Sequence, residues 1–173
     1  MAEELCLACG LCCNGVLFKD VELQPGDDAA RLKSVGLPVR NPSSPQRPPK
    51  FAQPCVALGA DCRCRIYAER PARCRDFECA LFKAVVEGRT DTAAALRLVR
   101  AARRRVARVG RLLGELGDTD EHVPLSVRFR RVMKRFETHA PDAEAAAVFS
   151  KLTVAMQRLN VVLSEKFYPG SSA

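Results

Sequence analysis

Nine cysteines, all within the first 79 residues, are the side chains best suited to chemistry in this chain of 173 residues. Four of them, Cys6, Cys9, Cys12 and Cys13, lie within eight residues of one another. Five more follow further along: Cys55, Cys62, Cys64, Cys74 and Cys79. Thiolates are ligands for soft metal ions, and closely spaced thiolates repel one another unless a cation neutralises them. The pattern therefore predicts a metal or iron–sulfur site built from two loops that the fold brings together.

The spacing within the first set is typical of metal-binding loops. Cys6, Cys9 and Cys12 form C-x2-C-x2-C, the spacing of the three leading ligands in bacterial ferredoxins, and Gly10 suits such a loop. The fourth ferredoxin cysteine, followed by proline, is absent. Cys13 directly follows Cys12 instead, and since adjacent side chains point in different directions, Cys13 faces a second centre or a bridging position.

Two other uses of the cysteines stay open on the residues alone. A disulfide framework is disfavoured by the odd number of cysteines and by an acidic N-terminus that does not resemble a secretory signal. A redox-active C-x-x-C at Cys6 and Cys9 lacks the usual βαβ context. We expect a reducing, cytoplasmic location, where structural disulfides are uncommon. If metal binding is correct, eight thiols exceed the four ligands of one zinc ion or one cluster, so either two centres form or only a subset ligates.

The elements that must position these cysteines are short in the first half of the chain. We expect a strand or extended segment over residues 16–23 and a short helix over residues 28–35 capped by Asp27. Six prolines make residues 38–54 an extended loop. A tight turn near residues 59–61 and an extended piece over 63–67 should follow. A helix should then run from Pro71 through Val86 and end at Gly88.

The second half has clear helical periodicity. Apolar residues step by three or four from Leu96 to Leu116, with Asp91 as a cap and Gly117 as a stop. A shorter helix begins near Pro124, and a last one begins near Pro141. The expected fold is mainly α. An irregular Cys-rich metal-binding loop domain (residues 1–88) packs against an antiparallel bundle of about three helices (residues 89–173).

The longer pattern resembles the CxxCxxCC cysteine-cluster family, also called YkgJ-like and described as a zinc- or iron-chelating domain. The resemblance rests on Cys6-x2-Cys9-Gly-x-Cys12-Cys13, on Pro54-Cys55-x2-Leu58, and on Cys64-Arg-Ile-Tyr-x2-Arg70-Pro71-x2-Cys74-Arg-x-Phe77. It covers about residues 6–80. The resemblance implies that the metal ligands are Cys6, Cys9, Cys12, Cys13, Cys55, Cys64, Cys74 and Cys79, with Cys62 as an extra cysteine.

The resemblance implies an iron–sulfur cluster or Zn²⁺ as the cofactor. Some relatives carry this module beside a flagellin lysine methylase, but no glycine-rich cofactor loop is visible here. No Ser/His/Asp order, paired-carboxylate pattern or phosphate loop appears either. His122 and His139 lie outside the cysteine region, and we expect both to be surface residues. The sequence thus favours a binding protein over an enzyme, and leaves open an accessory or redox subunit of a modifying enzyme, or a metal- or redox-responsive regulator.

Charge points to the class of partner. The formal net charge is +8, and residues 89–173 hold 16 Lys and Arg against 9 Asp and Glu. The arginines between Arg97 and Arg111 should form a basic helical face. Such a face is usually just solvated; it is compatible with an acidic protein partner, and a nucleic acid is the less expected partner. With no Trp and two Tyr, the chain has little aromatic surface for base stacking. No run of 18 apolar residues occurs, so no membrane-spanning helix is expected. Arg63, Arg65, Arg73 and Arg75 flank the cysteines and are candidates to offset thiolate charge.

Overall fold

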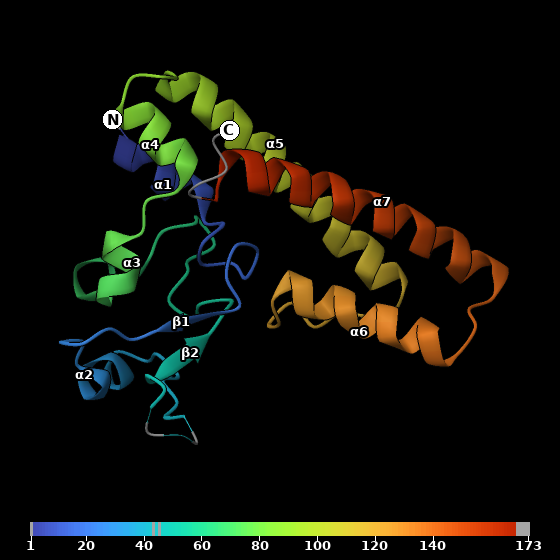
Figure 1. Ribbon diagram of the computed structural model, residues 1–173, viewed down its shortest axis with the longest axis horizontal. Helices are drawn as coiled ribbons and strands as arrows, with labels where there is room; N and C mark the ends of the chain where they lie inside the picture. The colour runs from blue at the N-terminus through green and yellow to red at the C-terminus, as the bar shows by residue number, and fades with distance from the viewer. Residues whose placement is uncertain (1, 43, 45, 169–173) are drawn as a thin grey trace.

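The computed structural model describes residues 2–42, 44 and 46–168. Within these residues the protein is mainly helical, with seven α-helices, a 3₁₀ helix and a two-stranded sheet (Figure 1). The elements in chain order are α1 (Ala2–Cys9), β1 (Asp20–Glu22), α2 (Ala29–Ser34), β2 (Lys50–Ala52), η1 (Tyr67–Glu69), α3 (Ala72–Asp76), α4 (Ala80–Val86), α5 (Thr92–Glu115), α6 (Leu125–Thr138) and α7 (Ala143–Lys166).

The three long helices form where the sequence predicts them. The Asp91 carboxylate accepts a hydrogen bond from the Ala94 amide at 2.7 Å and so caps α5, while Asp142 caps α7 in the same way. Gly117, with φ of +80°, follows the last turn of α5 in the left-handed conformation that favours glycine. Figure 1 shows α7 running back along α5, with α6 beside the far ends of both.

One apolar core joins these helices to the first cysteine segment. Val99, Val109 and Leu113 of α5 are buried with Leu152 and Leu159 of α7. The same core takes in leucines from the N-terminal segment and α4, namely Leu5, Leu11, Leu17 and Leu81. The end of α7 also hydrogen-bonds to this region, because the Tyr168 hydroxyl donates to the Leu17 carbonyl at 3.1 Å. The cysteine segment is thereby held against α5 and α7.

A second, smaller core lies under the two-stranded sheet. Strands β1 and β2 pair antiparallel with Val21 opposite Phe51, and both of these side chains are buried with Leu32 of α2. The extended segment predicted over residues 16–23 thus contains β1. The proline-rich segment, predicted as an extended loop, contains β2 at its end.

Asp28, not Asp27, caps α2, so the predicted cap was wrong by one residue. Asp27 instead accepts hydrogen bonds from the Gln24 amide and from the Ala72 amide, both at 2.8 Å. The second of these bonds ties the start of α3 to the turn before α2. Local sequence gives no sign of it, because the two residues are 45 positions apart.

Two further helical expectations need correction. Cys6 and Cys9 lie on α1 and not in a loop, because the Ala-, Glu- and Leu-rich start of the chain favours helix and buries Leu5. The single helix expected from Pro71 to Val86 is two helices, α3 and α4. Between them Phe77 is extended and its ring packs edge-on against Phe18 at 4.9 Å, so a tertiary contact overrides the local helical pattern.

Gly15 lies where three segments meet. Its carbonyl accepts a hydrogen bond from the Leu125 amide at 3.1 Å, and its φ is +77°. An added Cβ would lie 3.0 Å from the Pro124 Cα and 3.3 Å from the Pro54 ring. Glycine is therefore required both by the backbone conformation and by the close approach of α6.

Replacing Gly15 with alanine should destabilise the fold by about 2–4 kcal/mol, the sum of left-handed strain and overpacking. Gly26→Ala is the matched control, since Gly26 has φ of +94° but nothing lies within 4 Å of its added Cβ. The control should lose only the strain, about 1–2 kcal/mol. Urea unfolding of both variants measures the difference, and equal losses would contradict the packing role of Gly15.

No helix among the described residues combines the length and apolar character needed to cross a membrane.

Candidate metal centre

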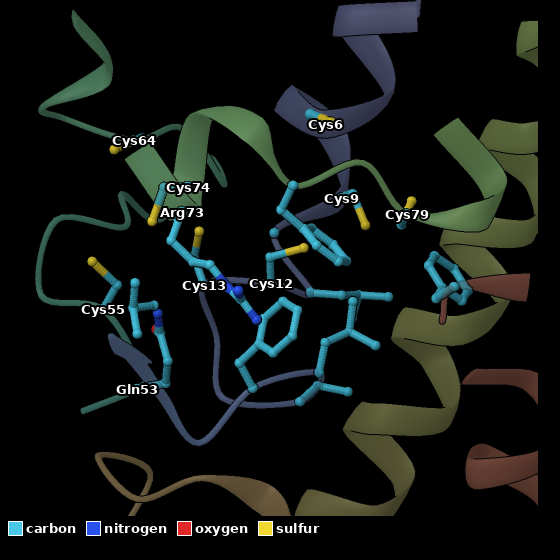
Figure 2. A pocket seen from close by; sticks show the side chains of 18 of the residues that line it. Cys6, Cys9, Cys12, Cys13, Gln53, Cys55, Cys64, Arg73, Cys74 and Cys79 are labelled. Atoms are coloured by element: carbon cyan, nitrogen blue, oxygen red, sulfur yellow. The ribbon is translucent and has the colours of Figure 1, made fainter. Parts of the chain in front are cut away.

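All nine cysteines line one cavity of about 790 Å³ between the N-terminal segment, α3, α4 and the end of α7 (Figure 2). None is in a disulfide; Cys6 is exposed and the other eight are partly buried. Figure 2 shows the labelled thiols on two sides of this cavity. Apart from Cys62, the thiols form two groups of four on these two sides, and Cys12 and Cys13 are where the groups meet, since Cys13 has the largest charge effect on Cys12.

The first group contains Cys6, Cys9, Cys12 and Cys79. Cys6 and Cys9 lie one turn apart on α1, so both face the same side of the helix. Gly10 then turns the chain with φ of +68° and places Cys12 in the following turn. Cys79 comes from the N-terminus of α4, which contacts α1. The break between α3 and α4, which sequence periodicity missed, is what puts Cys79 beside the first three thiols.

The second group contains Cys13, Cys55, Cys64 and Cys74. The Cys55 amide donates to the Cys13 carbonyl at 2.7 Å, which joins the two cysteine segments directly. A tight hairpin brings Cys64 next to Cys55, because Leu58 and Cys64 form a β-bridge and the Gly59 amide donates to the Arg63 carbonyl at 2.7 Å. Cys74 is supplied by α3.

Burial controls the protonation of the first group. Burial, together with the smaller effects of the nearby Cys79 and Cys6 thiolates, raises the pKa of Cys9 to about 12. Burial also raises the pKa of Cys12 well above its usual value, with Cys13, Cys9, Cys79 and Cys6 acting in the same direction. Each thiol is thus destabilised as an anion first by burial and then by its thiolate neighbours, and a bound cation would relieve both effects.

Burial raises pKa values in the second group of thiols as well. Burial, together with the thiolates of Cys55, Cys74 and Cys64, raises the pKa of Cys13 to about 12. Burial also raises the pKa of Cys74 to about 12, with Cys55 and Cys64 as its thiolate neighbours. The charge effects of these thiolates on one another's pKa therefore involve all four cysteines of the second group.

Backbone amides already point at three of the sulfur atoms. The Cys9 sulfur accepts from the Leu11 amide, and the Cys55 sulfur accepts from the amides of Ala57 and Leu58. The Cys79 sulfur accepts from the Phe82 amide at 3.4 Å. Each donor lies two or three residues after its cysteine. Such N–H···S bonds favour the thiolate and tune iron–sulfur clusters, so these loops suit metal ligation.

Among the described residues, no three Cys, His, Asp or Glu side chains are yet drawn together closely enough to hold one ion. Metal ligands lose their protons on binding, and the ion then draws the thiolates together. The two groups are therefore sets of neighbouring donors and not finished coordination shells.

Cys62 lies apart from this division. It packs against Gly10, where an added Cβ would lie 3.4 Å from the Cys62 Sγ. It also has φ of +67°, a left-handed conformation that is uncommon for a residue with a side chain. The expectation that Cys62 is an extra cysteine stays a prediction.

Two cations that the sequence did not assign to the site act on the pKa values of the thiols, namely Arg70 and Arg103. Arg70 lowers the pKa of Cys13 and Cys74 against the larger effect of burial, and its guanidinium stacks on Tyr67 at 3.7 Å. Arg103 of α5 does the same for Cys9 and donates a hydrogen bond to the Ala8 carbonyl at 2.9 Å. Of the four arginines expected near the site, Arg73 and Arg75 line the cavity. Arg63 faces Asp61 at 3.8 Å, and Arg65 is exposed and outside the cavity lining.

Arg103 was missed as a site residue, because in the sequence it belongs to a run of arginines on α5. Only the packing of α1 on α5 reveals its role. No signal in the sequence distinguishes it from the other arginines of that helix.

Gln53 is a second residue that the sequence did not single out. Its side chain lines the cavity beside Cys55 (Figure 2) and is 2% exposed. Among the described residues its Oε1 has no hydrogen-bond partner. A buried acceptor without a donor costs about 1–3 kcal/mol.

Replacing Gln53 with methionine, which has similar length, should stabilise the metal-free protein by about 1 kcal/mol, because the unpaired acceptor is removed. Urea unfolding in the presence of a chelator and a reductant measures this gain. Gln157→Met on the exposed side of α7 is the control and should change stability little. A loss of stability in Gln53→Met would mean that the amide has a bonding partner in solution.

Cysteines that converge from four segments on one cavity place the protein in the class of cysteine-rich chelating domains. The profile of the CxxCxxCC family, described as "Putative zinc- or iron-chelating domain", matches residues 5–95, and the chain belongs to this family. The resemblance read from the sequence is thereby confirmed. No curated protein and no solved structure matches the chain significantly.

Proposed function

We propose that the protein chelates metal at two four-cysteine centres, as iron–sulfur clusters or as zinc. The first centre would use Cys6, Cys9, Cys12 and Cys79, and the second Cys13, Cys55, Cys64 and Cys74. The observation that carries the proposal is the placement of eight thiols in two sets around one cavity (Figure 2). Apart from the effect of Cys13 on Cys12, the charge interactions among these thiols stay within each set. Four thiolates are the complement of one structural zinc ion or one cubane cluster.

Cys12 and Cys13 give each centre one ligand from adjacent positions in the chain. Their side chains leave the backbone in different directions, and Figure 2 shows them on either side of the turn. The double cysteine of the family pattern therefore serves to supply two centres from one turn. We assign metal binding to residues 1–88, with residues 89–173 as a basic helical extension, and place the protein in the reducing cytoplasm.

The residues of the chain have separate roles at these centres. Deprotonated cysteines hold the metal, backbone amides stabilise the sulfur charge, and Arg70 and Arg103 offset part of the remaining negative charge. Bound zinc would supply a structural cross-link, whereas an iron–sulfur cluster would supply one-electron chemistry.

Anaerobic purification followed by iron, zinc and sulfide analysis tests the proposal. A brown protein with a broad absorption band near roughly 400 nm and acid-labile sulfide would identify iron–sulfur clusters. A colourless protein with two zinc ions per chain would identify a structural or metal-handling role. A folded protein that carries neither metal would overturn the proposal.

A second candidate function is a metal- or redox-responsive regulator, which the contact between Arg103 and Ala8 favours. This hydrogen bond links the basic helix α5 to the helix that carries Cys6 and Cys9. A regulator predicts that partner binding by α5 differs between the metal-loaded and metal-free forms. Equal binding by both forms would remove this candidate.

A further inference from the structure

The exposed side of α5 carries a straight row of arginines, here called the arginine stripe. Its members are Arg97, Arg100, Arg104, Arg108 and Arg111. At 100° per residue they fall on one side of the helix, opposite the buried Val99, Val109 and Leu113. All five arginines are exposed.

The protein itself does little to neutralise this charge. Within the described residues, the one carboxylate paired with the stripe is that of Glu115, which lies 3.9 Å from Arg111. Glu115 is also the only acidic residue in the sequence of α5. Five neighbouring cations repel one another, and an anion supplied from outside would relieve that repulsion.

The chemistry of the stripe favours phosphate over carboxylate on a protein. All basic residues of α5 are arginine and none is lysine, and the guanidinium fork binds phosphate through two parallel hydrogen bonds. The buried centre of a protein interface is typically enriched in apolar or aromatic side chains. The exposed large apolar side chains, namely Val56, Tyr67, Val86, Met133, Val154 and Val161, all lie outside α5.

The dimensions suit a nucleic-acid strand. From Arg97 to Arg111 the stripe rises about 21 Å, the length of about six phosphates of one strand in a duplex. A duplex is favoured over a single strand, because single-strand binding relies on aromatic stacking and the chain has no Trp and two Tyr.

We propose that the arginine stripe of α5 binds the phosphate backbone of a double-stranded nucleic acid, without reading its base sequence. Binding of this kind depends on charge and on the geometry of the backbone. It uses residues outside the cysteine cavity, so it stands or fails independently of metal chelation.

Fluorescence anisotropy of the full chain as purified anaerobically, with labelled 20-bp DNA and RNA duplexes of mixed sequence, tests the proposal. Contact with four or five phosphates predicts a slope of about −4 for log affinity against log salt. The affinity should then fall by roughly 10²–10³-fold between 50 and 200 mM salt. The two duplexes show whether the stripe prefers DNA or RNA geometry.

The double variant Arg104→Gln/Arg108→Gln should reduce that slope by about two. Arg97→Gln/Arg100→Gln should act alike, as a second pair in the same row. Arg130→Gln/Lys134→Gln on α6 removes the same charge from another exposed surface and is the matched control. Its slope should be unchanged, and metal content should be equal in all three variants.

Three results would overturn the proposal. One is the absence of binding to either duplex at 50 mM salt. Another is an equal effect of the α6 control, which would mean that net charge alone acts. The third is competition by poly-glutamate as effective as that by unlabelled duplex, which would point to an acidic protein partner.

Discussion

Replacing Cys9 with serine is expected to remove about half of the bound metal and leave the other half in place. Cys9 has its thiolate neighbours, Cys79 and Cys6, within the first group. The loss of one ligand in four should open that centre, since structural metal sites need a complete set of thiolates. Cys55→Ser should remove the other half, because Cys55 has Cys64 as its thiolate neighbour in the second group.

The double variant Cys9→Ser/Cys55→Ser should carry almost no metal. Cys62→Ser is the control, since Cys62 packs against Gly10 and belongs to neither proposed centre. Metal per chain, determined by elemental analysis after anaerobic purification, gives the result. Complete loss of metal in either single variant would contradict two separate centres and indicate one shared centre.

The two centres should also differ in what their loss does to the fold. The first group lies on the core shared with α5 and α7, to which Cys9, Cys12 and Cys79 contribute. The second group borders the small core beneath the sheet, to which Cys55, Cys64 and Cys74 contribute. A small core depends more on its metal, so Cys55→Ser should expose β1 and β2 to hydrogen exchange more than Cys9→Ser does.

Removing the metal is expected to make stability fall steeply with pH in the alkaline range. Burial raises the pKa of Cys9, Cys13 and Cys74 from 9.0 to about 12 in the folded chain. Between these values the unfolded chain loses thiol protons that the folded chain retains. The unfolded chain then binds fewer protons than the folded chain, so the free energy of unfolding decreases as pH rises from about 9 towards 12.

Each such thiol contributes about 1.4 kcal/mol per pH unit in that window. Urea unfolding at pH 8 and pH 10, with chelator and reductant present, measures the effect. The metal-loaded protein should vary much less between these pH values, because its ligands have already lost their protons. A metal-free protein with equal stability at pH 8 and pH 10 would contradict the buried, protonated state of these thiols.

The sequence predicted the long helices well because their signals are local. Asp91 and Gly117 mark the ends of α5, and the apolar spacing from Leu96 to Leu116 marks its buried side. The turn near residues 59–61 was also predicted from local signals and is present, with the Cys62 amide bonded to the Gly59 carbonyl at 2.9 Å.

Expectations that depended on distant contacts were less successful. The break before Cys79 depends on Phe18 and on the bond from the Ala80 amide to the Phe167 carbonyl, and neither lies near it in the chain. The cap of α2 was misplaced because Asp27 bonds to Ala72, 45 residues away.

The eight candidate ligands could be named from their spacing, but their grouping could not. Cys13 and Cys12 are adjacent in sequence and belong to different groups, whereas Cys79 joins cysteines that lie 67 or more positions earlier. The two groups become distinct only when α3, which carries Cys74, and α4, which begins after Cys79, are placed in the fold. Arg103 and Gln53 could not be predicted as site residues for the same reason, because their neighbours in space come from segments distant in the sequence.

The hydrogen bond from the Tyr168 hydroxyl to the Leu17 carbonyl, across 151 residues, has a consequence for biosynthesis. Chains leave the ribosome N-terminus first, so the cysteines emerge long before α7 is made. Leu5, Leu11 and Leu17 cannot be buried until Leu159, Leu163 and Phe167 arrive to complete their core. The nascent chain thus carries open thiols through most of its translation, and this interval is when metal delivery competes with oxidation.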